Sequence, residues 1–330
     1  MNLKLRHLII FILLLILSAC GTNQQSKEDT DEQSSGLSKD KSEVVVIDNN
    51  GFTQEFTEAP TRAISLNQHV TEIMLALGLE DSMIGTAYLD DEIYEPLQEA
   101  YEKIPVISDQ YPSKEQVIAL EPDFLYGGWS SAFDEKTIAS QEELLELGIH
   151  SYLQTSSTMV APKLEDIYND IRNIAAIFRV EERGEQLIEE MNTDIAEITG
   201  QLPEVDKELP VLVFDSGETD IFTASQNFMN ELITLAGGVN IFGDIEGNWT
   251  TVSKEEAVDK APEVIVVVDY GSTTAQEKIN FIKSDPALST TPAAKNNRFV
   301  VLPLSAASEG VRVAEAIEIL AKGFYPEYFN

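Results

Sequence analysis

A set of aromatic and polar side chains in this 330-residue sequence has the chemistry needed to hold a small molecule. Large aromatic rings offer flat apolar faces to a planar ligand, and a histidine or an arginine can hydrogen bond its polar groups. Most of these residues follow segments with the apolar composition of strands, where α/β sheets bind ligands. The set is His69, Tyr88, Trp129, Trp249, Tyr270 and Arg312. We expect these residues to line one ligand pocket.

Each assignment has a structural alternative. A tyrosine or a tryptophan near a strand end can instead pack in a core, and a loop histidine can lack any ligand. Arg312, at the start of the last predicted helix, can instead pair with Glu309 or Glu315. The only two tryptophans both fall in predicted loops, and Trp249 lies in an irregular polar segment. This placement favours a shared pocket.

The sequence lacks the common signatures of catalytic and metal sites. It has no Gly-rich loop ending in Gly-Lys-Ser/Thr, no His-Glu-x-x-His and no Gly-x-Ser-x-Gly. Once residues 1–19 are removed, His69 and His150 are the remaining histidines, too few for a site of three histidines on a transition metal. We expect no catalytic residue, no resident cofactor and no metal ligand.

The charge of the chain restricts its partners. With 57 acidic and 22 basic side chains, the formal net charge is −35 at pH 7. Such an excess of negative charge excludes nucleic acid as a partner. It keeps a protein soluble, and it would also suit a cationic ligand or a basic docking partner.

The N-terminal segment is typical of an exported protein. Lys4 and Arg6 precede an apolar run at 8–17, so residues 1–19 are predicted to be a signal peptide. Leu17-Ser-Ala-Cys20 resembles a bacterial lipobox, which implies lipid attachment at Cys20. Cys20 is the only cysteine, so no disulfide can form within the chain. Residues 20–43 are polar and are predicted to be a flexible, lipid-anchored linker.

The elements that must position these residues alternate between strand and helix. Residues 44–56 predict a hairpin around Asn49-Asn50-Gly51, and strand and helix segments then alternate along residues 44–180 and again along 203–330. Between them, residues 181–202 carry apolar side chains at helical spacing and no proline. An ordinary surface helix is the alternative for this segment. We predict an α/β fold in which two Rossmann-like lobes are joined by a single long backbone helix.

Four segments carry a resemblance to a known family. In chain order they are residues 62–78, 120–125, 230–240 and 252–266. After a lipobox and around a long helix, they resemble the class III, helical-backbone substrate-binding proteins of ABC importers for iron-siderophores, haem and vitamin B12. The resemblance implies a ligand cleft between lobes and one glutamate on each lobe that pairs with arginines of the permease. These glutamates are Glu72 and Glu231, although the sequence alone shows only helical acids that would normally be exposed.

The resemblance also implies a role. The protein would be a monomer, lipid-anchored on the extracytoplasmic face of the cell membrane, that delivers a small molecule to the transmembrane subunits of an ABC permease. An iron-siderophore complex is the first expectation for the ligand. A corrinoid (vitamin B12), haem or a deazaflavin-type cofactor follows closely, the last because residues 126–129 and 269–271 are similar to that branch. An exported hydrolase or chelatase and a surface adhesin are the alternatives from other classes.

Overall fold

The computed structural model describes residues 44–134, 136–204 and 207–329. Residues 42–330 form one compact unit. The predicted signal peptide at 1–19, the linker at 20–43 and Cys20 lie outside the described residues. In the described ranges, none of the helices is both long enough and apolar enough to cross a bilayer.

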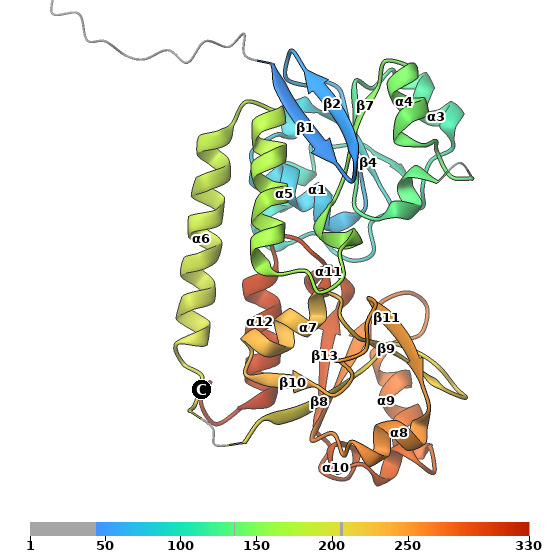
Figure 1. Cartoon of the computed structure of the whole chain (residues 1–330), viewed down its shortest axis with the longest axis vertical. Helices are drawn as coiled ribbons and strands as arrows, with labels where there is room; N and C mark the ends of the chain where they lie inside the picture. Colours follow the sequence, from blue (N-terminus) through green and yellow to red (C-terminus); the bar gives the residue numbers. More distant parts are fainter. Residues whose placement is uncertain (1–43, 135, 205–206, 330) are drawn as a thin grey trace, which may run out of the picture. The chain divides into compact units, whose positions relative to one another are not determined.

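A five-stranded parallel sheet forms the centre of the N-terminal half (Figure 1). Its order is β5-β4-β3-β6-β7, with β3 Ala63–Leu66, β4 Met83–Ala87, β5 Val106–Ser108, β6 Phe124–Gly127 and β7 His150–Leu153. The connecting helices are α1 Gln68–Ala76, α2 Gln98–Tyr101, α3 Lys114–Ala119 and α4 Gln141–Glu146, with shorter 3-10 turns at Glu80–Ser82, Glu95–Leu97 and Ser130–Phe133. The strand order reverses direction at β3. The loops after β3 and β6 therefore border the crevice where such sheets bind ligands.

The C-terminal half repeats this plan with a four-stranded parallel sheet. Its order is β10-β8-β12-β13, with β8 Leu209–Phe214, β10 Gly238–Asn240, β12 Val264–Asp269 and β13 Phe299–Pro303. The helices are α7 Phe228–Leu235, α8 Lys254–Asp259, α9 Ala275–Ser284, α10 Pro292–Lys295, α11 Leu304–Ala307 and α12 Val313–Phe324, and a 3-10 turn spans Leu288–Thr290. A separate antiparallel pair joins β9 Ile221–Ala224 to β11 Trp249–Val252. Here the order reverses at β8, so the loops after β8 and β12 border the second crevice.

The predicted N-terminal hairpin covers an edge of the first sheet. Strands β1 Val45–Asn49 and β2 Phe52–Phe56 pair around Asn50 and Gly51, both of which have positive φ, at 57° and 81°. The Asn49 side chain donates to the carbonyl of Leu153 at 2.8 Å and accepts from its N–H at 2.7 Å. These bonds satisfy backbone groups on edge strand β7, which would otherwise be open to pairing with another chain.

A long helix, α6, runs beside both halves (Figure 1). It spans Glu181–Thr199 and packs on α5 Leu164–Ile177 and on α12 of the C-terminal half. At about 1.5 Å per residue, its 19 residues give a rod of roughly 28 Å. Gly184 permits a close approach to α5, since a Cβ there would lie 2.7 Å from the Cβ of Ala175. The two-lobed α/β fold is thus confirmed, and the helix ends a few residues before the predicted limit at 202.

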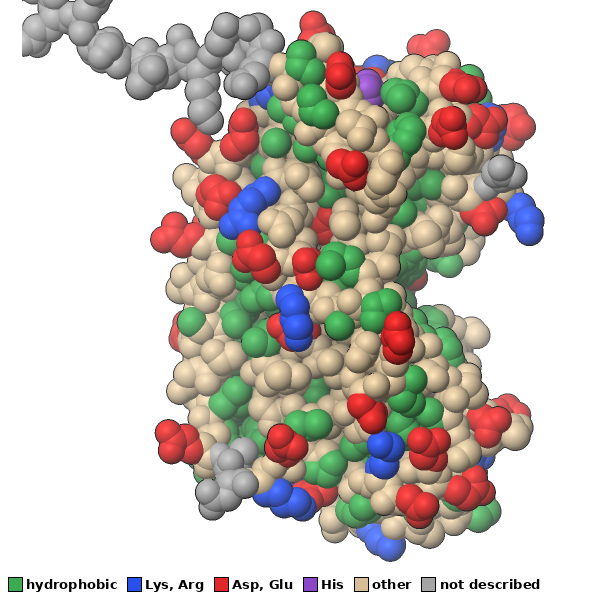
Figure 2. Space-filling view, in the orientation of Figure 1, with side chains coloured by type: hydrophobic (Ala, Val, Ile, Leu, Met, Phe, Trp, Pro, Cys, Tyr) green, Lys and Arg blue, Asp and Glu red, His purple; other side chains and the backbone are tan. Residues whose placement is uncertain are grey.

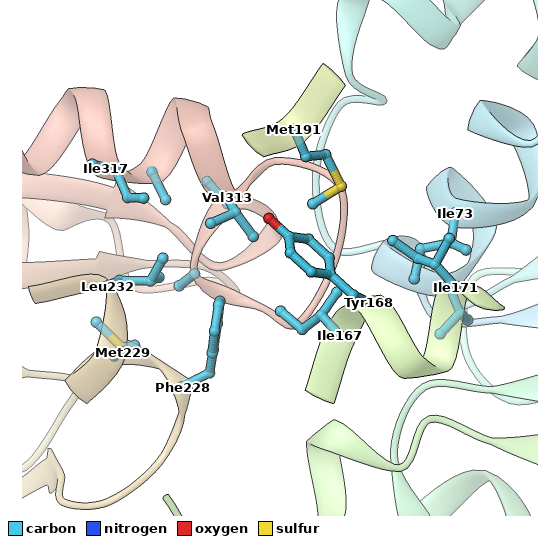
Figure 3. Close-up of a cluster of buried hydrophobic side chains, with 14 of the residues drawn as sticks. Ile73, Ile167, Tyr168, Ile171, Met191, Phe228, Met229, Leu232, Val313 and Ile317 are labelled. Atoms are coloured by element: carbon cyan, nitrogen blue, oxygen red, sulfur yellow. The ribbon is translucent and has the colours of Figure 1, made fainter. Parts of the chain in front are cut away.

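The hydrophobic core is continuous between the two halves on the side of α6. One cluster of buried side chains joins Ile73 of α1 and Tyr168 of α5 to Phe228 of α7 and Val313 of α12 (Figure 3). Met191, from α6, lies in the same cluster. Spreading the halves on this side would expose apolar surface, at a cost of roughly 25 cal/mol per Å².

Candidate functional site

A cavity of about 350 Å³ lies between the halves, at the carboxyl edges of both sheets. Figure 2 shows the surface indented between the halves, on the side away from α6. Aromatic, hydroxyl and amide side chains and two carboxylates line the cavity, and no described lysine or arginine does. The lining residues are Trp129, Ser157, Asp215, Phe222, Asn227, Phe228, Met229, Asn248, Trp249, Tyr270, Leu304, Ala307, Ser308 and Glu309.

The N-terminal half contributes an aromatic cluster centred on Trp129, which follows β6. The Trp129 ring lies 5.2 Å from the ring of His69 and 6.3 Å, edge to face, from that of Tyr88. The structure therefore brings three of the predicted residues together. Of the three, Trp129 lines the cavity, while His69 is buried behind it and Tyr88 flanks it.

The position of His69 depends on a strained loop and on a glycine. Asn67, just before α1, has φ 92° and ψ 150°, a conformation that residues other than glycine rarely adopt. A Cβ on Gly128 would lie 2.4 Å from Cε1 of His69, so only glycine fits there. Burial lowers the pKa of His69 to about 4, and a hydrogen bond with the Gly128 backbone only partly offsets this shift. His69 is therefore neutral at pH 7 and supports the Trp129 ring from behind.

The C-terminal half supplies the opposing aromatic surface. The Trp249 ring stacks on that of Phe222, with centroids 5.3 Å apart and planes inclined by 15°. The prediction of an irregular segment around Trp249 is wrong, because this residue begins β11 and pairs with β9. The Tyr270 hydroxyl donates to Oδ2 of Asp215 at 2.8 Å, and burial raises the pKa of Tyr270. Asp215 and Tyr270 follow the neighbouring strands β8 and β12, which explains why they meet.

Arg312 does not reach the cavity, which contradicts its assignment to the ligand. Its guanidinium is buried and bonds both carboxylate oxygens of Glu72, through Nη2 at 2.6 Å and Nε at 2.9 Å. Nη2 also donates to the carbonyl of Glu92 at 2.6 Å, and Nη1 donates to Ser305 at 3.2 Å. The alternative partner Glu315 is farther away, at 3.8 Å. All its donors thus face protein groups between the two halves.

The same ion pair contradicts the docking assignment of Glu72. Its side chain is 1% exposed, so a permease arginine has no access to it. The cause is tertiary: α1 is buried along nearly its whole length and contacts Gly310 and Arg312 of the C-terminal half. Glu72 also accepts from the N–H of Tyr94 at 3.0 Å and from Gln68 at 3.1 Å. Glu72 therefore acts as a structural residue.

Glu231, the second docking candidate, lies on α7 near the surface. Its carboxylate accepts from Nζ of Lys163 at 2.6 Å, and the two side chains are 14% and 57% exposed. Lys163 precedes α5, so this pair also joins the two halves. Because the lysine is mostly exposed, a pair of this kind contributes little stability.

The sequence interpretation identified Trp129, Trp249 and Tyr270 but missed the other eleven lining residues, among them Ser157, Asp215, Phe222 and Glu309. Asp215 directly follows an apolar strand, the signal that identified Tyr270, so the same rule applied to carboxylates would have found it. Ser157 lies in the 3-10 turn Ser156–Thr158 and Glu309 in the loop after α11. Neither directly follows a strand, and only the tertiary arrangement brings them together. In the described part of the chain, no group of three or more His, Cys, Asp or Glu side chains is arranged to hold a metal ion.

Comparison with known proteins identifies the family. The sequence pattern of the family described as periplasmic binding protein matches residues 64–306. The chain is 28% identical, over 96% of its length and 95% of the relative's, to an uncharacterized ABC transporter substrate-binding lipoprotein of Bacillus subtilis. It is 26% identical to a vitamin B12-binding protein of Photorhabdus laumondii, over 71% of this chain and 78% of that one. A crystal structure of a periplasmic binding protein from Veillonella parvula superimposes with a TM-score of 0.79, at 30% identity, covering 86% of this chain and 98% of that one.

Proposed function

The chain belongs to the periplasmic binding protein family, and from this premise we propose that it captures a small molecule outside the cytoplasm and delivers it to an ABC permease. The observation that carries the proposal is the cavity between the halves, where both sheets present the loops that bind ligands in α/β folds. The relatives of this chain are binding proteins. Among the residues that line the cavity, a catalytic nucleophile with a base is not evident. Binding without turnover, by a monomer, is therefore proposed over an exported hydrolase or chelatase.

The cavity favours a ligand with a flat apolar ring system and no net negative charge. Trp129 and Trp249 face it from the two halves, while its ionisable lining groups are the acids Asp215 and Glu309 and the phenol of Tyr270. An anionic iron chelate or the carboxylates of haem would find no cationic partner among the described lining residues. We therefore rank a corrinoid, the ligand named for several relatives, ahead of the iron-siderophore complex that we first expected. A ring system of that size would extend through the cavity mouth, since 350 Å³ is small for it.

A binding panel tests this proposal. Residues 42–330 form a compact unit that can be studied in solution. We expect quenching of tryptophan fluorescence to saturate at one equivalent with cyanocobalamin or with cationic ferrioxamine B. Binding of anionic ferric enterobactin or hemin is expected to be weaker. Mass spectrometry should recover each ligand unchanged. A panel in which nothing binds, or in which a ligand is cleaved, would refute the proposal.

We propose that Glu231 is the contact for a permease arginine, which would displace Lys163. Glu231→Gln is expected to lower ligand uptake several-fold in cells and to leave ligand affinity unchanged, because rim charges mainly govern encounter and orientation. Glu146→Gln, an exposed change on α4, is the matched control. Uptake that equals wild type in Glu231→Gln would remove this residue from the docking surface.

We also propose that the protein is held at the extracytoplasmic face of the cell membrane by lipid on Cys20. The lipobox-like segment before Cys20 supports this anchor, as does the name of the Bacillus subtilis relative, a substrate-binding lipoprotein. Residues 20–43 would then act as the tether between the lipid and the folded unit.

A further inference from the structure

Glu309 lies where the cavity meets the junction of the two halves. It follows α11 and lines the cavity. Its carboxylate Oε2 accepts from the hydroxyl of Ser157 at 3.3 Å, and its backbone carbonyl accepts from Nε2 of Gln154 at 2.9 Å. Both partners belong to the N-terminal half. The backbone of Glu309 is therefore held by Gln154, and its carboxylate by Ser157.

The described charges that act on Glu309 do not favour its ionised form. Among the described residues, its carboxylate forms no ion pair. Asp170 of α5 acts on it electrostatically and repels a second negative charge. Asp170 is itself occupied, accepting from the Tyr152 hydroxyl at 2.6 Å and from the N–H of Ser156 at 2.9 Å.

The other ionisable groups near Glu309 do not neutralise it either. His69 packs against the adjacent Gly310, and its burial keeps the imidazole neutral at pH 7. Asp215, in the same cavity, is a second acid and holds the Tyr270 hydroxyl. Lys278 lies against the Tyr270 ring, 4.5 Å from its centroid, but donates to the carbonyl of Val268. Arg312 is committed to Glu72.

Burial raises the pKa of Glu309 to about 7, and the charge of Asp170 adds a smaller effect in the same direction. Hydrogen bonds from the Glu309 backbone and from Ser157 partly oppose this shift. A hydrogen-bond donor on a ligand would stabilise the ionised form of a carboxylate in this buried position. A ligand that donates to it must therefore bind more tightly to the ionised form.

We propose that Glu309 is the specificity residue of the cavity, that it accepts a hydrogen bond from an amide or ammonium N–H on the rim of the ligand, and that ligand binding is coupled to loss of its proton. This inference rests on the proposed function. Asp215 would accept a second donor from the same ligand. The cavity would then select amide-rich or cationic molecules over anionic ones.

Cyanocobalamin, whose rim carries amides and whose charge does not change near neutrality, is the probe. With a pKa of about 7, roughly a tenth of Glu309 is ionised at pH 6 and nine tenths at pH 8. The wild-type Kd is therefore expected to be about tenfold lower at pH 8 than at pH 6. Glu309→Gln should bind about tenfold more weakly than wild type at pH 8 and show no change with pH.

Two controls make the result decisive. Asp215→Asn should weaken binding but keep the pH dependence, and Glu146→Gln should change neither. A wild-type Kd that is equal at the two pH values, or a Glu309→Gln variant that keeps the pH dependence, would overturn the inference while leaving the proposed function intact. Failure of wild type to bind any molecule of the panel would instead refute the proposed function, and this inference with it.

Thermal unfolding without ligand separates a folding defect from a binding effect. Since the pKa of Glu309 is raised in the folded state, its protonated form contributes stability that is complete below about pH 4.5 and is lost as the pH rises through about 7. Glu309→Gln stays neutral, so it is expected to have a higher Tm than wild type at pH 8 and an equal Tm near pH 4.5. A lower Tm at both pH values would contradict this account of the carboxylate.

Discussion

Glu72→Ala is expected to lower the free energy of unfolding by about 3–5 kcal/mol, which is a large part of the stability of an ordinary domain. The change removes the carboxylate that pairs with the Arg312 guanidinium. The Arg312 side chain is only 8% exposed, so its charge would stay buried without a partner. Urea unfolding of residues 42–330, followed by circular dichroism, measures the loss. Ligand affinity should fall only through the unfolded fraction, because neither residue lines the cavity.

A double variant tests whether the loss of stability comes from losing the Glu72–Arg312 ion pair itself or from leaving the Arg312 charge buried without a partner. Replacing Glu72 and Arg312 together by leucine removes both charges, and it is expected to cost much less than Glu72→Ala alone. The exposed pair of Lys103 and Glu80, at 3.2 Å, is the matched control, and Glu80→Ala should cost less than about 1 kcal/mol. A loss of that small size in Glu72→Ala would mean that water or another cation reaches Arg312.

Trp249→Ala is expected to raise the Kd for cyanocobalamin about 30-fold, or about 2 kcal/mol. Trp249 stacks on Phe222 and lines the cavity, so its ring offers a preformed flat surface to a planar ligand. Titration by isothermal calorimetry checks this, because one of the two fluorescent tryptophans is lost. Trp129→Ala should weaken binding in the same way from the other half.

The control for the tryptophan variants is an aromatic residue far from the cavity. Tyr328 is 52% exposed near the C-terminus and does not line the cavity, so Tyr328→Ala should leave the Kd unchanged. If Trp249→Ala also bound with wild-type affinity, the stacked pair would have no role in recognition.

The fold was predictable because its signals are local. The alternation of apolar strands with helices defined both sheets, and the Asn50-Gly51 turn defined the hairpin. The uninterrupted periodicity of residues 181–202 identified α6, within three residues at its end. Strand ends also placed Trp129 and Tyr270 correctly at the cavity, although contact of either residue with a ligand stays a prediction.

The errors concern contacts between distant parts of the chain. Glu72 and Arg312 are 240 residues apart, and each by itself has the features of a functional surface residue. Only the packing of α1 against the C-terminal half shows that they neutralise each other. Glu309 was considered only as a possible partner of Arg312, and its place in the cavity was missed for the same reason, since it follows from the tertiary arrangement of the described residues.

The shared core shown in Figure 3 also bears on how the cargo is exchanged. Parting the halves would wet Phe228, Tyr168 and Val313, so wide spontaneous opening is rare. Under the proposed function, the protein would keep its ligand bound until the permease contacts both halves and drives them apart. If the proposed function is correct, part of the free energy of ATP hydrolysis by the transporter would be needed to expose this apolar surface.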